Sequence, residues 1–205
     1  MEQIQLNLIN KSNDTNHSEY VIFQKNVNPN FSELSVAWRV VKNLGRDDYH
    51  PFSYSLKMEV SAGDSYGNFT PKLDAYPGQK FKVSLTGSGD RLTLDGADNS
   101  PTDIQVVNDL AQGAISANIY RDGKLLAKKT SIAPREFADF EFKPTIFIGA
   151  AAQIQEGVVI NSAILSTNTE LSLLGIASAD IVITGGGPGP TSQPFEFSLQ
   201  NVVFA

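Results

Sequence analysis

Apolar and polar residues alternate with a period of two along much of this chain. From Phe52 to Val60 every second residue is apolar, and the residues between them are serine, lysine or glutamate. Lys80–Leu85 and Phe195–Leu199 repeat the alternation. Because successive side chains of a strand point to opposite faces of its sheet, this pattern predicts strands with one buried and one solvated face. Turn-forming residues separate the runs at intervals of about 8–12 residues, which is typical of a β-sandwich.

Two further segments carry clear local signals. Between Ile115 and Thr130 the pair Asp122-Gly123 predicts a hairpin with a two-residue type I′ turn, because both turn positions need a positive φ. Ser32–Gly45 fits both a helix and a strand, and its valines favour a strand with Trp38 in the core.

A short helix is predicted near residues 101–112. Ser100 offers an N-cap, Pro101 suits the first turn, and apolar residues at 104, 107, 110 and 111 follow at helical spacing before Gly113. Elsewhere we find no alternation of strands with long helices. The pattern therefore predicts an all-β protein, a mostly antiparallel, jelly-roll-like sandwich of about 11–13 strands. No linker-like stretch interrupts the chain, and we expect a single domain over residues 1–205.

Composition narrows the function. The chain has 205 residues, no cysteine and a formal net charge of −6. The missing cysteines exclude disulfides, thiolate metal sites and a cysteine nucleophile. The acidic balance argues against nucleic acid as a partner, since such a protein needs a basic surface. No run reaches the roughly 18 apolar residues of a transmembrane segment. The chain opens with alternating residues rather than a signal peptide, so we expect a cytoplasmic, bacterial protein, with release by a non-classical route as the alternative.

Charge is distributed unevenly along the chain. All 16 lysines and arginines lie in residues 1–143, and residues 144–205 carry only four acidic side chains. Two interpretations of the charge-poor part remain open. Its strands are either central in the sandwich and protected on both faces, or they present an apolar surface to another subunit.

Aspartates crowd one short stretch of the chain. Asp90, Asp95, Asp98 and Asp103 lie within 14 residues. Calcium prefers several oxygen ligands from one flexible loop, so these four side chains are the candidate metal ligands. Their spacing differs from the calcium loop of an EF-hand, and Asp103 alternatively supplies the N-terminal charge of the predicted helix. We expect no other cofactor.

Four aromatic residues lie in or beside predicted turns and are candidate ligand or surface contacts: Tyr49, Tyr66, Phe69 and Tyr76. Exposed rings near loop tips can stack on sugars or enter a lipid interface.

No catalytic constellation emerges. Gly63-Asp64-Ser65-Tyr66-Gly67 matches the nucleophile-elbow pattern, but Asn68–Pro71 does not begin a helix and both histidines, His17 and His50, precede the serine. A glycine-rich β-turn explains the motif better. We therefore expect a protein that is not an enzyme.

Four short words resemble one family of proteins: Asn10-Lys11-Ser12, Val21-Ile22-Phe23-Gln24, Ser35-Val36-Ala37-Trp38 and His50-Pro51-Phe52. They look like small bacterial all-β proteins of the rhizosphere-induced RhiA type. The resemblance implies a compact β-sandwich in which the Phe-Gln strand is followed by the Val-Ala-Trp strand, and it carries over no catalytic residue.

The leading hypothesis is a non-enzymatic, self-associating or partner-binding β-sandwich that forms homo-oligomers or larger assemblies. Strand-like sequence reaches both termini, and Ile4–Ile9 or Phe195–Phe204 could add to a neighbouring sheet edge. The alternative is a module that binds a glycan or lipid surface, with calcium as a cofactor.

Overall fold

The structure is a computed structural model that describes residues 3–28, 35–160 and 168–205. Within these ranges it contains sixteen strands and one 3-10 turn at Gly189–Thr191. The predicted all-β fold is confirmed. All pairings between described strands are antiparallel except two, which confirms the mostly antiparallel sheets. There are more strands than expected, because three of them are only three or four residues long, too short to show an alternation.

The chain divides into two compact units. Unit 1 comprises Met1–Lys25, Leu34–Leu56 and Pro144–Ala205, and unit 2 comprises Asn26–Glu33 and Lys57–Lys143. The single domain expected over residues 1–205 stays a prediction beside this division. Each unit contains two four-stranded sheets.

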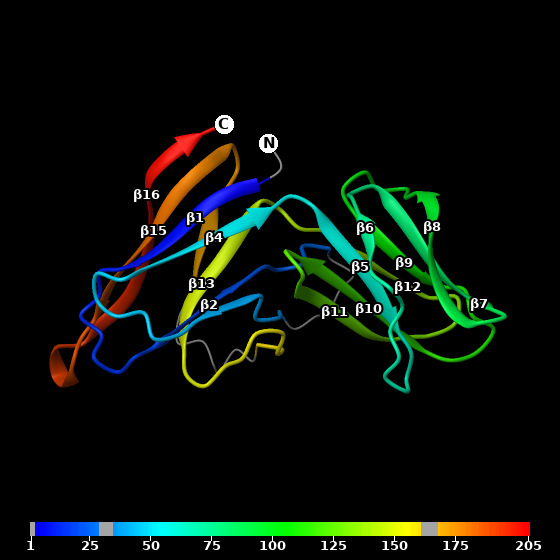
Figure 1. Ribbon diagram of the computed structural model, residues 1–205, viewed down its shortest axis with the longest axis horizontal. Coiled ribbons are helices and arrows are strands. Elements are labelled where there is room, and N and C mark those ends of the chain that lie inside the picture. Colours follow the sequence, from blue (N-terminus) through cyan, green and yellow to red (C-terminus); the bar gives the residue numbers. More distant parts are fainter. Residues whose placement is uncertain (1–2, 29–34, 161–167) are drawn as a thin grey trace. The chain divides into compact units, whose positions relative to one another are not determined.

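Unit 1 has its sheets in the strand orders β16-β15-β1-β4 and β14-β13-β2-β3, and Figure 1 shows the four strands of the first sheet running side by side. The strands are β1 (Gln3–Asn10), β2 (Glu19–Phe23), β3 (Arg39–Val41), β4 (Tyr49–Ser55), β13 (Thr145–Ala151), β14 (Asn168–Ser172), β15 (Ile176–Gly186) and β16 (Gln193–Phe204). Aromatic rings from both sheets meet in the core. Tyr20 on β2 contacts Phe197 on β16 edge-to-face, and Trp38 makes a similar contact with Tyr54 on β4.

Unit 2 has its sheets in the orders β11-β10-β5-β6 and β12-β9-β7-β8. The strands are β5 (Met58–Gly63), β6 (Leu73–Ala75), β7 (Gln79–Thr86), β8 (Gly89–Ala97), β9 (Ile104–Asn108), β10 (Ile115–Arg121), β11 (Lys124–Ile132) and β12 (Phe137–Phe140). The predicted hairpin is confirmed as β10 and β11, and both Asp122 and Gly123 have the positive φ that the turn needs.

The two units share one strand topology, but the chain order of the strands begins at a different strand in each unit. Unit 2 runs from β5 to β12 in chain order, and unit 1 follows the same path in the order β13 to β16 and then β1 to β4. With β13 matched to β5, every strand pairing of one unit has a counterpart in the other. The match includes the two parallel pairs, β1 with β15 and β9 with β7. Unit 1 is therefore a circular permutation of unit 2.

The match extends to side-chain hydrogen bonds. Asn10 ends β1 and Asn108 ends β9, and both side chains are buried. Each Nδ2 donates to a carbonyl at the end of a strand of the other sheet or just after it, Leu44 O at 2.7 Å and Ile132 O at 2.9 Å. Each Oδ1 accepts the backbone N–H of the residue two positions later, at 2.9 and 3.1 Å. The same asparagine thus joins the two sheets in each unit.

The turn beside each asparagine is also shared. Asp47 and Arg135 occupy matching positions, both with φ of 69°. Their backbone N–H groups donate to the carbonyls of Asn10 and Asn108, each at 2.7 Å. Because φ in this region is uncommon outside glycine, its recurrence at two matched positions supports the equivalence of the units.

The predicted helix near residues 101–112 is wrong. Residues 104–108 form β9, in which Ile104, Val106 and Asn108 are buried and the two residues between them are half-buried. This period of two, with β-branched residues, suits a strand between β7 and β12 better than the helical spacing did. The N-terminal helix charge assigned to Asp103 is withdrawn with the helix.

Two other strand predictions need correction. The alternation from Phe52 to Val60 runs through Leu56, yet β4 ends at Ser55 in unit 1 and β5 begins at Met58 in unit 2. The N-terminal strand is central in its sheet, with β15 on one side and β4 on the other, so Ile4–Ile9 offers no free edge. The strand predicted within Ser32–Gly45 is confirmed as β3, with Trp38 fully buried, and positions 32–34 lie outside the described residues.

Some strands of the charge-poor part are central in a sheet, and others lie at a sheet edge. β13 and β15 are central and largely buried, as the first interpretation requires. β14 and β16 are sheet edges, and most of β16 is exposed. Residues 161–167 of the charge-poor part lie outside the described residues.

Candidate functional sites

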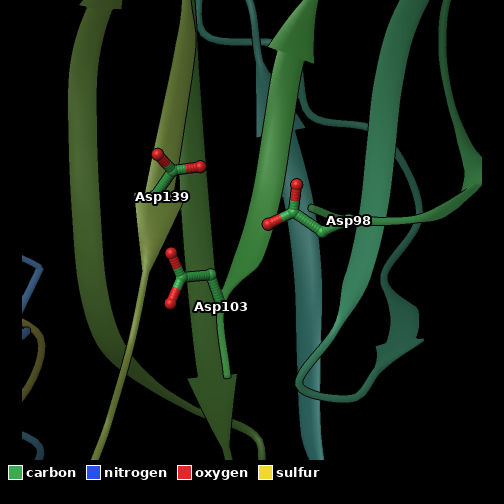
Figure 2. Close-up of side chains that lie close together, drawn as sticks. All are labelled: Asp98, Asp103 and Asp139. Carbon is green, nitrogen blue, oxygen red and sulfur yellow. The ribbon is translucent and has the colours of Figure 1, made fainter. Parts of the chain in front are cut away.

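Three carboxylates converge at one end of a sheet in unit 2. Asp98 follows β8, Asp103 precedes β9 and Asp139 lies on β12, and Figure 2 shows their side chains gathered in one place. One carboxylate oxygen from each lies within 4.8 Å of the other two. Asp103 is buried, and the other two are half-buried. In unit 1 the strands that match β8 and β9 are β16 and β1, the last and first described strands of the chain.

Neutral donors partly satisfy these carboxylates. Asn28 Nδ2 and Thr102 Oγ1 donate to the two oxygens of Asp103, both at 3.2 Å. Gln105 Nε2 donates to Asp139 Oδ1 at 2.9 Å. Among the described residues no lysine or arginine forms an ion pair with the three aspartates. Burial raises the pKa of Asp139, and the negative charges of Asp98 and Asp103 raise it further against the opposing Gln105 hydrogen bond.

Only half of the predicted calcium ligands meet. Asp98 and Asp103 belong to the cluster, whereas Asp95 forms ion pairs with Lys82 at 2.8 Å and Lys80 at 3.6 Å. Asp90 lies at the opposite end of β8, as its second residue. Asp139 was missed because it is distant in sequence, and the pairing of β12 with β9 brings it opposite Gln105. Carboxylate oxygens are the ligands that calcium prefers, and calcium binding by these side chains stays a prediction.

The carboxylate cluster predicts a pH-dependent stability. A carboxyl whose pKa is higher in the folded state than its ordinary value of 3.8 destabilises the protein as the pH rises through that interval. Asp139→Asn keeps an oxygen that accepts from Gln105 and removes the charge. We expect it to raise the free energy of unfolding at pH 7 by up to about 1 kcal/mol, the size of a partly exposed charge interaction. At pH 3 the gain should disappear. Urea unfolding at both pH values measures this.

Asp90→Asn is the matched control, because Asp90 is exposed and lies outside the carboxylate cluster. It should change stability little at either pH. An equal gain for Asp139→Asn at pH 3 and pH 7, or a loss at pH 7, would contradict the repulsion among the three aspartates.

The predicted aromatic contacts are dispersed. Tyr49 is 69% exposed on β4 of unit 1, and Tyr76 is 48% exposed between β6 and β7 of unit 2. Tyr66 and Phe69 share the loop between β5 and β6, with 89% and 59% of their side chains exposed. Ser65 lies in the same loop, in an exposed β-turn followed by no helix. His50 is exposed on β4, and His17 lies in an exposed loop of unit 1.

The longest sheet edge belongs to unit 1. β16 has 12 residues and pairs only with β15 among the described strands. Its inner side chains, including the buried Phe197, pack on the core, while Glu196, Ser198 and Gln200 are exposed. Regular pairing with β15 covers Glu196–Gln200 and is interrupted on both sides. Near its end, Val203 and Phe204 are 55% and 72% exposed.

Comparison with protein-family models, with curated proteins and with solved structures found no match. The resemblance to RhiA-type proteins therefore stays an expectation. Among the described residues, no helix has both the length and the apolar character needed to cross a membrane.

Proposed function

We propose that this protein associates with a second copy of itself by strand addition at β16. The observation that carries the proposal is that one edge strand is both long and nearly uncharged. β16 extends over 12 residues, and Glu196 is its only charged side chain. An edge strand presents unpaired N–H and C=O groups, and a second strand can satisfy them.

The other sheet edges are protected by known devices. Short strands, proline and charged side chains all discourage edge pairing. β3 and β6 have three residues each, β12 has four, and the five-residue β14 carries Glu170 at its centre. β4 contains Pro51. The two long remaining edges are charged: β8 carries Asp90, Arg91 and Asp95, and β11 carries Lys124, Lys128 and Lys129.

The comparison of β16 with β8 is the most direct, because the two strands occupy matching positions in the two units. Both are the outer strands of their sheets, and both pair with the strand that precedes them in the chain. The common topology therefore leaves the charge of this edge free to differ: β8 carries three charged side chains and β16 carries one. This difference favours a role for the edge of unit 1 in association.

Two features set the limits of the pairing segment. Pro194 lies near the start of β16, and a β-bulge follows Gln200, where Asn201 has φ of 49°. The regular segment is thus Glu196–Gln200. If two copies pair antiparallel about Ser198, Glu196 of each lies opposite the uncharged Gln200 of the other. The pairing then brings no like charges together and follows two-fold symmetry.

The experiment is light scattering during size exclusion over a range of protein concentrations. We expect a mass of twice the 22.2 kDa chain at high concentration. The triple variant Glu196→Lys, Ser198→Lys, Gln200→Lys places lysines opposite lysines in the proposed pair. It should weaken association by about 100-fold and leave a monomer.

Two controls separate charge from position. Glu196→Gln with Ser198→Gln changes the same exposed side chains without adding charge and should still associate. Thr93→Lys places a lysine at the β8 position that matches Ser198, and it should also associate. A wild-type chain that stays monomeric, or a triple variant that associates normally, would contradict the proposal.

A further inference from the structure

Two adjoining clefts open at the end of unit 2 that lies opposite the carboxylate cluster along β8. One has a volume of about 400 Å³ and is bordered by the β5–β6 loop and the start of β8. The other has a volume of about 490 Å³ and is bordered by the same loop and residues 110–114. Asp64 and Asp90 line both. Each volume lies in the range of small-molecule sites, about 300–1,000 Å³.

The loop that separates the clefts is held in a fixed shape. Asp64 Oδ1 accepts the backbone N–H groups of Tyr66 at 2.8 Å and Asn68 at 2.9 Å, and its Oδ2 accepts Asn68 Nδ2 at 2.7 Å. The Phe69 ring lies against Gly63, where an added Cβ would be 2.8 Å from Phe69 Cε1. The two exposed rings of this loop, Tyr66 and Phe69, are therefore presented on an ordered support.

The negative charge of the cleft lining disfavours anionic ligands. Asp64 and Asp90 are the only charged residues among those that line either cleft, so phosphate, sulfate and sialic acid groups would be repelled. Within the described part of the chain, no hydrogen bond or ion pair holds the Asp90 side chain. Its carboxylate is available to accept hydrogen bonds from a pair of ligand hydroxyls, and charge-assisted bonds of this kind are strong.

The neutral polar lining distinguishes hydroxyl ligands from amines. Gln112 offers amide donors as well as an acceptor and Ser88 adds a hydroxyl, whereas Asn68 Nδ2 already donates to Asp64 Oδ2. An amine has only donors when protonated and would leave the amide N–H groups without acceptors. A sugar hydroxyl can both donate and accept, and the C–H face of a sugar ring can pack on an exposed aromatic ring.

We propose that these clefts bind a neutral oligosaccharide, with Asp90 accepting hydrogen bonds from its hydroxyls and Tyr66 packing on a sugar ring. The lining residues all belong to unit 2 and β16 belongs to unit 1, so this proposal and the proposed self-association rest on different residues. It also uses two of the four aromatic residues singled out by sequence, Tyr66 and Phe69, and leaves Tyr49 and Tyr76 outside.

The test is an array of neutral, amino, sialylated and sulfated oligosaccharides probed with the full-length chain, followed by calorimetric titration of any retained sugar. We expect retention of neutral sugars. Asp90→Ala and Tyr66→Ala should each weaken binding at least tenfold, and Tyr76→Ala, which changes an exposed tyrosine outside the clefts, should not.

All variants are at exposed positions, and circular dichroism confirms that each is folded before binding is compared. Retention of no neutral sugar, a preference for amino or anionic sugars, or wild-type binding by both Asp90→Ala and Tyr66→Ala would overturn the proposal.

Discussion

Replacing Asn108 with alanine is expected to lower the free energy of unfolding of unit 2 by about 3 kcal/mol. The Asn108 side chain is fully buried and makes three hydrogen bonds to the backbone. Its Nδ2 donates to Gly113 O and Ile132 O, both at 2.9 Å, and its Oδ1 accepts Leu110 N at 3.1 Å. Alanine leaves these backbone groups without partners, and each unsatisfied buried group costs about 1–3 kcal/mol. Urea unfolding followed by circular dichroism measures the loss.

Asn99→Ala is the matched control, because Asn99 is exposed in the same unit. Its effect should stay within about 0.5 kcal/mol, as is usual for surface positions. Asn10→Ala removes the equivalent bonds in unit 1 and should produce a comparable loss there. A stability of Asn108→Ala equal to that of Asn99→Ala would show that the asparagine does not join the two sheets.

The second large effect is expected in unit 1, where Trp38→Ala should cost about 4 kcal/mol. Trp38 is fully buried, and its ring contacts Phe52 and Tyr54 edge-to-face at centroid distances of 6.3 and 6.0 Å. The Arg39 guanidinium lies 4.6 Å from the Trp38 ring centroid. Alanine removes these contacts and leaves a cavity between elements of both sheets.

Trp38→Phe is the appropriate comparison, since it keeps an aromatic ring in the same place. It should cost clearly less than Trp38→Ala, because most of the volume remains. Circular dichroism is again the suitable probe, because Trp38 is the only tryptophan and its fluorescence is lost in both variants. Equal stability of the alanine variant and the wild type would place Trp38 outside the core.

Local signals predicted much of the fold. Alternation identified β7 and β16. In β7 the buried Phe81 and Val83 alternate with half-buried residues, although Leu85, which continues the apolar pattern, is exposed. Asp122-Gly123 set the hairpin turn through its positive φ values. The helix predicted over Ile104–Asn108 was wrong because the apolar residues of this segment fit both the helical and the strand period. The pairing of this segment with β7 and β12, which is a tertiary interaction, decided for the strand.

Non-local features could not be predicted. The alternation between Phe52 and Val60 continues without a change of phase across Leu56, although the chain passes there from unit 1 to unit 2. The shared topology is hidden for a similar reason, since unit 1 is completed only when residues from both ends of the chain meet. Both terminal strands were predicted to offer an edge. β16 lies at a sheet edge, whereas Ile4–Ile9 lies between two strands, because the pairing partners of a strand cannot be deduced from its own sequence.

The candidate sites were likewise predicted where they depend on local sequence and missed where they depend on strand pairing. Asp98 and Asp103, proposed as ligands because of their crowding in sequence, lie close together in the fold, whereas placing Asp139 beside them required knowledge of the β9–β12 pairing. Asp90 was proposed as a metal ligand and lies instead in the clefts beside Tyr66. Proximity in sequence does not place Asp90 with the carboxylate cluster, because a nine-residue strand is long enough to put its two ends at opposite ends of the sheet.

Hydrogen–deuterium exchange at low and high protein concentration shows whether β16 pairs with the same strand of a second copy. Strand addition should protect the outward-facing amides of Glu196–Gln200 more strongly as the concentration rises, and the amides of β8 should exchange at the same rate throughout. Exchange in β16 that is independent of concentration, or new protection that appears on β8 instead, would contradict association through this edge.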